Sequence, residues 1–366
     1  MNINIGFNLK QTKLNKNKTN LADLDHLALK DFFLQISEKP FRAVQLLKWI
    51  YKRGIVDFNL MTDLSKQLRE KLQEIAVIEF PEIIKQQISK DGTHKWLVSI
   101  GADNVVEMVF IPEKNRGTLC ISSQVGCPIN CSFCLTAKQG FSKNLTTAEI
   151  IGQVWLATKL VNNIKHPAIS VARITNVVLM GMGEPLLNFD AVIRAVSIMC
   201  DDNSYNLSKR KVTISTAGVV PGIEKLINTT DVALAISLHA PTNALRDQLV
   251  PLNRKYPIEM LIEACKKYLM VSKINHITVE YVMLKGFNDR LEHARQLIKI
   301  LSGFSCKVNL IPFNYFAGSL YSCSTDEDIY IFNKTLNNAG IVTTMRTTRG
   351  YDINAACGQL VGKVLK

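Results

Sequence analysis

The sequence has no uninterrupted apolar stretch of about 18 residues, the shortest that spans a bilayer as a helix, so we expect no membrane segment. Residues 1–7 do not combine a charged start with an apolar block, and the sequence therefore predicts no secretory signal. Short internal repeats are absent, and so is low-complexity sequence beyond the first residues of the chain. Nine cysteines in a chain of this length, three of them in one run, indicate a reducing cytoplasm rather than a disulfide framework.

Acidic residues are scarce relative to basic ones. Lys and Arg total 44, Asp and Glu total 31, and the formal net charge is +13. A sequence pI of about 9.3 is typical of proteins with a polyanionic partner, and nucleic acid is the first candidate. General solubility is the alternative explanation for such an excess.

The chain has enough apolar material for one large domain and a small one, since 47% of its 366 residues are hydrophobic and 20% are charged. Residues 1–20 are rich in Asn, Lys and Thr and are predicted to form a flexible basic leader. Residues 21–80 carry apolar positions at helical spacing and predict a small helical N-terminal domain, with Asp63 capping its third helix. Residues 81–112 have strand character around an Asp91-Gly92 turn and predict a short β extension that forms a small sheet.

Residues 113–350 are predicted to form the α/β core of the protein. About six strand candidates alternate there with amphipathic helices, which implies parallel strands joined by right-handed crossovers. Six repeats are fewer than the eight of a closed barrel, so the sequence favours an open, partial (β/α)6 barrel, with a flat doubly wound sheet as the alternative. Residues 351–366 remain as a separate C-terminal segment.

Three of the nine cysteines, Cys127, Cys131 and Cys134, have the spacing C-x3-C-x2-C. Three thiolates at this spacing can hold three irons of a cubane cluster and leave the fourth iron open to a small molecule. No second pair of Cys or His lies nearby, as a structural zinc site would require. A zinc site completed from a distance, or buried thiols grouped by chance, are the alternatives.

Polar residues follow the predicted strands at the ends where functional groups of parallel folds gather. Gly183 and Glu184 follow the second strand, and the two glycines of Gly-Met-Gly would let a ligand approach the backbone. Glu184 offers an acceptor for an ammonium group. Ser215, Ser237, Leu238, His239 and Asn314 follow later strands. The sequence therefore predicts one ligand site at this edge.

The chain resembles the RlmN family of adenosine methyltransferases, within the radical S-adenosylmethionine (SAM) superfamily, from about residue 21 to the C-terminus. The motifs that carry the resemblance are Cys120-Ile-Ser-Ser-Gln-Val-Gly-Cys127, Gly181-Met-Gly-Glu-Pro-Leu-Leu-Asn188, Ser237-Leu-His-Ala-Pro241 and Ala355-Ala-Cys-Gly-Gln359. It implies a radical SAM barrel, a [4Fe-4S] cluster on the three cysteines, and SAM at the open iron. The implied SAM contacts are Gly183, Glu184, Ser215, Ser237, Leu238, His239 and Asn314.

The resemblance also implies three catalytic residues. Cys357 would carry the methyl group as S-methylcysteine, Glu107 would accept a proton, and Cys120 would release the product through a transient disulfide with Cys357. The implied product is 2-methyladenosine, made in the peptidyl-transferase region of 23S rRNA and 3′ of the anticodon in some tRNAs. The outward basic residues of 21–80 make this part a candidate RNA-docking module, with an ordinary solvated face as the alternative. We expect an external one-electron donor of flavodoxin type, and a monomer is the default expectation.

Several other residues complete the sequence interpretation. Cys200, Cys265, Cys306 and Cys323 match no such motif and are predicted to be structural. Candidate RNA phosphate contacts are Lys138, Lys143, Lys209, Arg210, Lys211, Arg346 and Arg349.

Three rival functions remain open from the sequence. A Cfr-type relative methylates carbon 8 of the same adenine with the same cysteine pair, although the helical N-terminal stretch looks more like RlmN. A non-catalytic iron–sulfur or zinc protein that binds RNA is the rival from another class. A methylthiolating radical SAM enzyme would normally have a second three-cysteine run, and the sequence has none.

Overall fold

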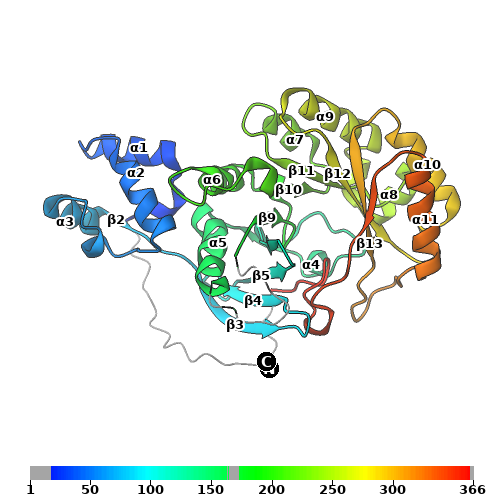
Figure 1. Ribbon diagram of the computed structural model, residues 1–366, viewed down its shortest axis with the longest axis horizontal. Coiled ribbons are helices and arrows are strands. Elements are labelled where there is room, and N and C mark those ends of the chain that lie inside the picture. The colour runs from blue at the N-terminus through cyan, green and yellow to red at the C-terminus, as the bar shows by residue number, and fades with distance from the viewer. Residues whose placement is uncertain (1–17, 163, 165–172, 363–366) are drawn as a thin grey trace.

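The computed structural model describes residues 18–162, 164 and 173–362, and Figure 1 shows their arrangement. Of the predicted leader, residues 1–17 lie outside the described residues. The prediction extended this leader to residue 20, whereas Thr19–Asn20 forms strand β1, which pairs in parallel with β2 (Ala76–Val77). Among the described residues, no helix has both the length and the hydropathy that crossing a bilayer requires.

The helical N-terminal part contains α1 (His26–Gln35), α2 (Arg42–Leu47), a π-helix (Lys48–Lys52) and α3 (Lys66–Ile75). The predicted cap of α3 is wrong, because the Ser65 hydroxyl, and not Asp63, accepts the hydrogen bond from the Leu68 N–H at 3.3 Å. Asp63 instead accepts a hydrogen bond from the indole N–H of Trp49 at 2.5 Å. The side chain that the local pattern predicted as the cap thus makes a tertiary contact instead.

The main sheet has ten strands in the order β14-β13-β12-β11-β10-β9-β6-β5-β4-β3. Neighbouring strands from β6 to β14 are parallel, and those from β3 to β6 are antiparallel. The bounds are β3 (Glu82–Ile88), β4 (His94–Ser99), β5 (Val105–Pro112), β6 (Gly117–Cys120), β9 (Asn176–Leu179), β10 (Val212–Thr216), β11 (Ala233–Ser237), β12 (Ile277–Met283), β13 (Cys306–Pro312) and β14 (Thr343–Met345).

The parallel strands follow one another in space in the same order as in the chain. Because crossovers between parallel strands are right-handed, such an order places every crossover helix on the same face of the sheet. A doubly wound sheet requires a reversal of strand order, and the order β6-β9-β10-β11-β12-β13-β14 has none. The open, partial barrel is therefore confirmed, and the doubly wound alternative is wrong. Strand β14 is an addition that the sequence pattern did not predict.

The β extension continues the main sheet and does not form a sheet of its own. Strand β5 pairs with β6, which would otherwise be the edge of the parallel part. The Asp91-Gly92 turn lies between β3 and β4. In the register, Val109 of β5 pairs with Cys120 of β6, and Cys120 pairs with Val178 of β9. The extension and the barrel therefore share one continuous concave face.

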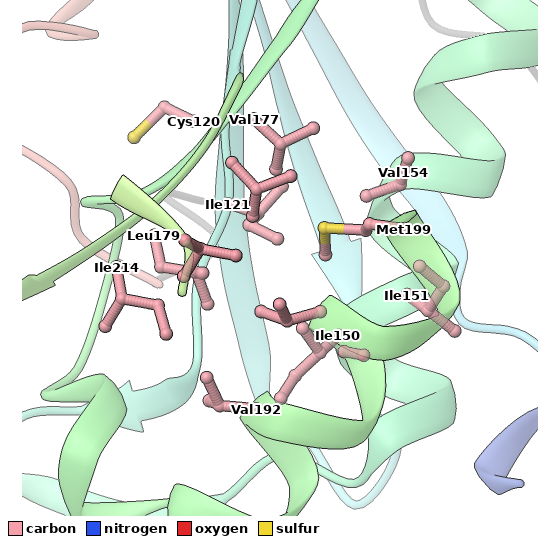
Figure 2. Close-up of a cluster of buried hydrophobic side chains, with 14 of the residues drawn as sticks. Cys120, Ile121, Ile150, Ile151, Val154, Val177, Leu179, Val192, Met199 and Ile214 are labelled. Carbon is pink, nitrogen blue, oxygen red and sulfur yellow. The ribbon is translucent and has the colours of Figure 1, made fainter. Parts of the chain in front are cut away.

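Helices cover the convex face of the parallel strands (Figure 1). They are α5 (Thr147–Val161), α6 (Phe189–Cys200), α7 (Val220–Leu226), α9 (Ile258–Val271), α10 (Leu291–Leu301) and α11 (Asp326–Asn338). The short α8 (Asn243–Leu249) instead packs near the carboxyl ends of the strands, beside the loop of the cysteine run. Figure 2 shows Val177, Ile121 and Ile214 among the side chains that pack against α5 and α6, while the Cys120 thiol points away from this cluster. Side-chain alternation therefore places Cys120 on the concave face.

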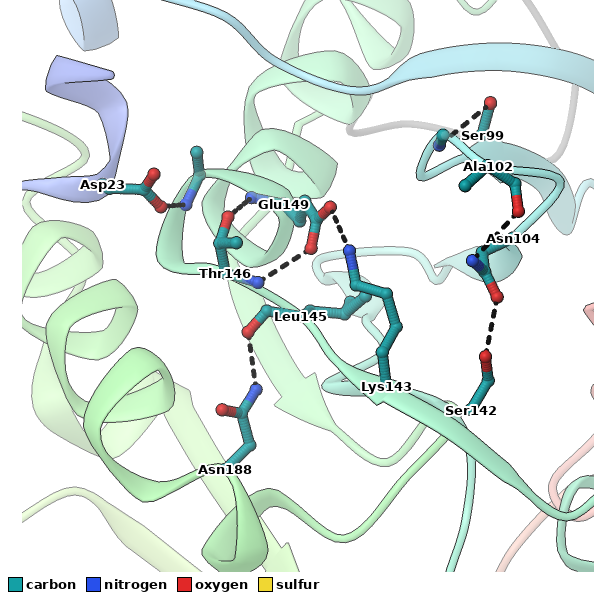
Figure 3. A network of polar contacts seen from close by, with 12 residues as sticks. Asp23, Ser99, Ala102, Asn104, Ser142, Lys143, Leu145, Thr146, Glu149 and Asn188 are labelled. Atoms are coloured by element: carbon teal, nitrogen blue, oxygen red, sulfur yellow. Dashed lines mark hydrogen bonds and ion pairs between the residues drawn. The ribbon is translucent and has the colours of Figure 1, made fainter. Parts of the chain in front are cut away.

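A polar network fixes the segment between the cysteine run and α5 (Figure 3). Thr146 and Glu149 form a capping box at the start of α5, and Lys143 of β8 (Phe141–Asn144) forms an ion pair with Glu149 at 2.8 Å. Asp23 of the N-terminal part accepts a hydrogen bond from the Ala148 N–H at 2.7 Å. The start of α5 thus joins the helical N-terminal part to the barrel.

Candidate functional site

A cavity opens at the carboxyl ends of the parallel strands and encloses about 910 Å³ of space, part of it continuous with solvent. Most of the residues predicted from the sequence line it, although they come from separate elements. Those lining residues are Cys127, Cys131, Cys134, Gly183, Glu184, Ser215, Ser237, His239, Asn314 and Cys357. The lining does not include Leu238, Cys120 or Glu107.

The three cysteines of the predicted cluster site lie in the loop between β7 (Gln124–Gly126) and α4 (Leu135–Lys138), and Cys134 is the residue before that helix. Burial raises the pKa of Cys127 to about 12, and burial together with the neighbouring thiols raises that of Cys131 well above its ordinary value. Burial thus favours the neutral thiols, and a cationic group beside them would favour the thiolates. A metal cluster would supply such a group.

A single metal ion is a different case. Within the part of the chain that the structure describes, no three His, Cys, Asp or Glu side chains are grouped so that one ion could be held between them. A cubane distributes its thiolates over separate irons, so its ligands need not surround one point. The cysteine loop thus offers three sulfur donors to the cavity, and these fit an iron–sulfur cluster.

Gly183 and Glu184 follow β9 and form one wall of the cavity. Gly183 has φ of +98°, and a Cβ there would lie 2.7 Å from the Gln124 nitrogen, so no larger residue fits without displacement. The Glu184 carboxylate accepts hydrogen bonds from the N–H groups of Leu186 at 3.1 Å and Ala217 at 2.7 Å. Burial nevertheless raises the pKa of Glu184 to about 7. A cation in the cavity would stabilise its ionised form.

His239 follows β11, and its ring lies edge-on to Phe133 of the cysteine loop with ring centroids 4.6 Å apart. Its Nδ1 accepts a hydrogen bond from the Val282 N–H at 3.0 Å. Burial, with the charge of Arg246, lowers the pKa of His239 to about 3, so the ring is neutral. The ring proton therefore resides on Nε2, and His239 can donate one hydrogen bond to a ligand.

The remaining predicted SAM contacts differ in how they meet the cavity. Ser215 and Ser237 line it, and the Asn314 amide donates a hydrogen bond to the carbonyl oxygen of Cys357 at 3.3 Å. Leu238 is fully buried in the core and does not line the cavity, and both of its backbone groups have protein partners. Its N–H donates to the Glu280 carbonyl at 3.1 Å, and its carbonyl accepts from the Arg246 guanidinium at 3.1 Å.

Cys357 lies in the cavity between charged groups. Burial raises the pKa of Cys357, while the Arg346 guanidinium acts to lower it. Burial and the Cys357 charge raise the pKa of Cys120 to about 12, and Arg346 again acts to lower it. Arg346 thus lies within electrostatic range of both thiols. All nine cysteines are free, so no disulfide joins this pair in the structure.

Glu107 lies outside the cavity lining but on the same face of the sheet as Cys120. Its Oε1 is 3.2 Å from Lys95 Nζ, and its Oε2 accepts a hydrogen bond from the Val361 N–H at 2.9 Å. Burial raises the pKa of Glu107, although Lys95, the Val361 N–H and Lys85 each act to lower it. Lys95 and the Val361 N–H therefore occupy one carboxylate oxygen each.

Sequence reasoning missed three charged residues at this site. Glu280 lines the cavity and was detectable as an acidic residue within the apolar run of β12. Arg346 lines it too, although the sequence suggested it only as a candidate RNA phosphate contact. Arg246 is fully buried and donates hydrogen bonds to the carbonyls of Ala217, Ser237 and Leu238. It ties together the ends of β10 and β11, and no local pattern distinguishes it from a surface arginine.

The four cysteines predicted to be structural line no part of the cavity. Cys265 is buried in α9, and Cys200 and Cys306 are half-buried. Cys323 is exposed. They therefore provide matched controls for the cysteines of the site.

Comparison with known proteins gives consistent matches along the chain. Residues 19–78 match the ribosomal RNA large subunit methyltransferase N-terminal domain family, and residues 121–298 match the radical SAM superfamily. Curated relatives described as dual-specificity RNA methyltransferase RlmN include one from Alkalilimnicola ehrlichii, 54% identical over 94% of this chain and 94% of that protein. Another, from Stenotrophomonas maltophilia, is 52% identical over 95% of this chain and 89% of that protein. The crystal structure of a radical SAM methyltransferase from Sphaerobacter thermophilus has a TM-score of 0.86 and 37% identity, and covers 94% of this chain and 100% of that chain.

Proposed function

The chain belongs to the RlmN family of dual-specificity RNA methyltransferases, and from this premise we propose that it methylates carbon 2 of adenosine in RNA. Its proposed substrates are 23S rRNA in the peptidyl-transferase region and some tRNAs at the adenosine 3′ of the anticodon. The net charge of +13 supports a polyanionic substrate. We further propose that the enzyme acts as a cytoplasmic monomer with an external one-electron donor of flavodoxin type.

One observation carries this proposal: Cys357 lines the same cavity as the three cysteines of the C-x3-C-x2-C run. In it, Cys127, Cys131 and Cys134 would hold a [4Fe-4S] cluster, and SAM would contact Gly183, Glu184, Ser215, Ser237, Leu238, His239 and Asn314. When bound, the cluster and SAM supply the one-electron chemistry that an aromatic carbon requires, because that carbon is a poor nucleophile.

The residues of the protein would then bind SAM, carry the methyl group and accept a proton. The Glu184 carboxylate accepts a hydrogen bond from the ammonium group of SAM, and His239 donates a hydrogen bond from its Nε2–H to the same molecule. Cys357 carries the methyl group to the adenine, and Glu107 accepts the proton that the adenine carbon loses. The Cys120 thiolate attacks the sulfur of Cys357. The bond from that sulfur to the methylene carbon breaks with its electron pair passing to the carbon, which takes up a proton to become the methyl group as the disulfide forms. Arg346 favours the thiolate of Cys120 for this attack, since its charge acts to lower the pKa of that thiol.

The position of the new methyl group is the decisive measurement. The protein is reconstituted anaerobically with iron and sulfide and incubated with SAM, a reductant and either 23S rRNA fragments or tRNA. Nucleosides from the digested RNA are then compared by mass spectrometry with standards of 2-methyladenosine and 8-methyladenosine. We expect the 2-methyl isomer in both RNAs. The 8-methyl isomer would assign the chain Cfr-type chemistry, and an absence of 5′-deoxyadenosine would indicate a non-catalytic binding protein.

A further inference from the structure

The segment that carries Cys357 is fastened to the β extension by one buried ion pair. Lys95 Nζ lies 3.2 Å from Glu107 Oε1 and donates a hydrogen bond to the Asn354 carbonyl at 3.2 Å. The other oxygen of Glu107 accepts the Val361 N–H at 2.9 Å. Lys95 and Glu107 are both about 8% exposed, so solvent does not satisfy either charge. The pair therefore holds the chain on both sides of Cys357.

The sheet register places this ion pair on the same face of the sheet as Cys120. In the antiparallel pairing of β4 with β5, Lys95 lies opposite Val109, and Leu97 lies opposite Glu107. Lys95 and Glu107 are thus diagonal neighbours on one face. Val109 also pairs with Cys120, so Cys120 projects from the same face. The ion pair from the β extension and Cys120 from the barrel therefore face the same segment, residues 351–362.

Other contacts hold the same segment as well. Asp352 accepts hydrogen bonds from the Ser89 hydroxyl at 2.5 Å and the Lys90 N–H at 3.2 Å, and Asp91 accepts one from the Gly350 N–H at 2.9 Å. These contacts come from the turn between β3 and β4. On the other side, the Leu135 N–H donates to the Gly358 carbonyl at 2.8 Å, and the Thr136 hydroxyl donates to the Leu360 carbonyl at 2.7 Å. Loss of Lys95 would consequently leave the segment attached but would remove its link to the Glu107 carboxylate.

We propose that Lys95 is a positioning residue that fixes the Glu107 carboxylate and the Cys357 segment relative to each other. This inference rests on the proposed roles of Glu107 and Cys357. In this arrangement the β extension sets where the methyl-carrying sulfur lies, in addition to adding strands to the barrel.

The charge of Lys95 has a second consequence for Glu107. A base must be ionised to accept a proton, and burial alone favours the neutral carboxyl. Lys95 is the largest influence acting against that burial, and the Val361 N–H and the more distant Lys85 add to it. Without Lys95, Glu107 becomes harder to ionise, and the proton acceptor is available only at higher pH.

The test uses the full-length, reconstituted enzyme and three variants at position 95 or close to it. Lys95→Met removes the charge and keeps a similar length, Lys95→Arg keeps the charge, and Lys90→Met is the matched control on the same hairpin. Hydrogen–deuterium exchange of the peptide containing residues 351–362 reports the segment without requiring turnover. The pH dependence of RNA methylation reports the proton acceptor.

In Lys95→Met we expect exchange within residues 351–362 to be faster by roughly tenfold, as loss of a hydrogen bond to a charged group predicts. The acidic limb of its pH–rate profile should move upward by roughly one pH unit or more, because an opposite charge has been removed from a carboxylate. Lys95→Arg should retain both properties largely as in the unmodified enzyme, and Lys90→Met should change neither.

If Lys95→Met is unstable because it leaves Glu107 unpaired, the double variant Lys95→Met/Glu107→Gln contains no unpaired charge and should fold. It should still show fast exchange in residues 351–362. Exchange at the unmodified rate in the foldable variant, or equal behaviour of Lys95→Met and Lys90→Met, would overturn the inference. A different outcome would be fast exchange in Lys95→Met while the wild-type enzyme makes no S-methylcysteine at position 357. That outcome would refute the proposed function and leave the positioning role of Lys95 intact.

Discussion

His239 Nδ1 accepts a hydrogen bond from the Val282 N–H at 3.0 Å, and this contact joins the ends of two neighbouring strands of the barrel. His239 has φ of +59°, a left-handed conformation that Asn adopts more readily than most residues. The backbone and the tautomer of His239 are therefore both set by its surroundings. The Nε2 proton is left for a ligand in the cavity.

Two substitutions at His239 should separate its structural and ligand-binding contributions. Asn can place its oxygen near the position of Nδ1, so His239→Asn should keep the Val282 contact and lose the Nε2 donor. We expect near-normal thermal stability and SAM affinity reduced by about tenfold. His239→Gln should lose the Val282 contact and about 1–3 kcal/mol of unfolding free energy. Equilibrium SAM binding and thermal denaturation check these outcomes, and equal SAM affinity in all three proteins would contradict the assignment.

SAM binding should weaken as the pH falls through about 7. The pKa of Glu184 is raised to about 7 by burial, so its carboxyl is neutral below that pH and ionised above it. An ammonium group is attracted by the ionised form alone, and a bound ammonium in turn favours that form. Titration of SAM between about pH 5.5 and 7 keeps the amine mostly protonated, since an α-amino group has a pKa of about 8. Glu184→Gln should bind weakly with little dependence on pH, and an equally steep dependence in this variant would exclude Glu184 as the cause.

Cys127→Ala should abolish the iron–sulfur cluster, because each of the three thiolates would hold its own iron. We expect reconstituted protein without brown colour, with iron and sulfide contents well below those of the unmodified protein, and without SAM cleavage. Cys323→Ala is the control, since Cys323 is exposed and does not line the cavity. A full complement of iron and sulfide in Cys127→Ala would disprove the cluster assignment.

Cys120→Ala should trap RNA attached to the protein through Cys357. Without the second thiol, the bond between Cys357 and the adenine has no nucleophile to release it. Denaturing gels of the reaction with substrate RNA should show a slowly migrating adduct that disappears on digestion with ribonuclease. The control is Cys265→Ala, which removes a buried thiol from α9 and should turn over normally. No adduct with Cys120→Ala, or the same adduct with both variants, would rule out the proposed role of Cys120.

Elements with a strong local signal were predictable from the sequence. The Asp91-Gly92 turn, the six parallel strands and the rim position of His239 follow from turn chemistry, alternation and the polarity of parallel folds. The cap of α3 was not predictable from the sequence, because Asp63 and Ser65 are both good caps. The hydrogen bond from the Trp49 indole to Asp63 is a tertiary contact that the local pattern does not contain. Strand β14 was not predicted, because its three residues, Thr343–Met345, are too few to show the alternation that identifies a strand.

The sequence by itself determined the spacing of the three cluster cysteines and which strand end each polar motif follows, because both depend on neighbours in the chain. Tertiary structure alone decided that the C-terminal segment crosses the concave face. Glu107 and Val361 are separated by 254 positions in the chain and still share a hydrogen bond. No local periodicity encodes such a contact, since it depends on the summed packing of the sheet that lies between the two residues.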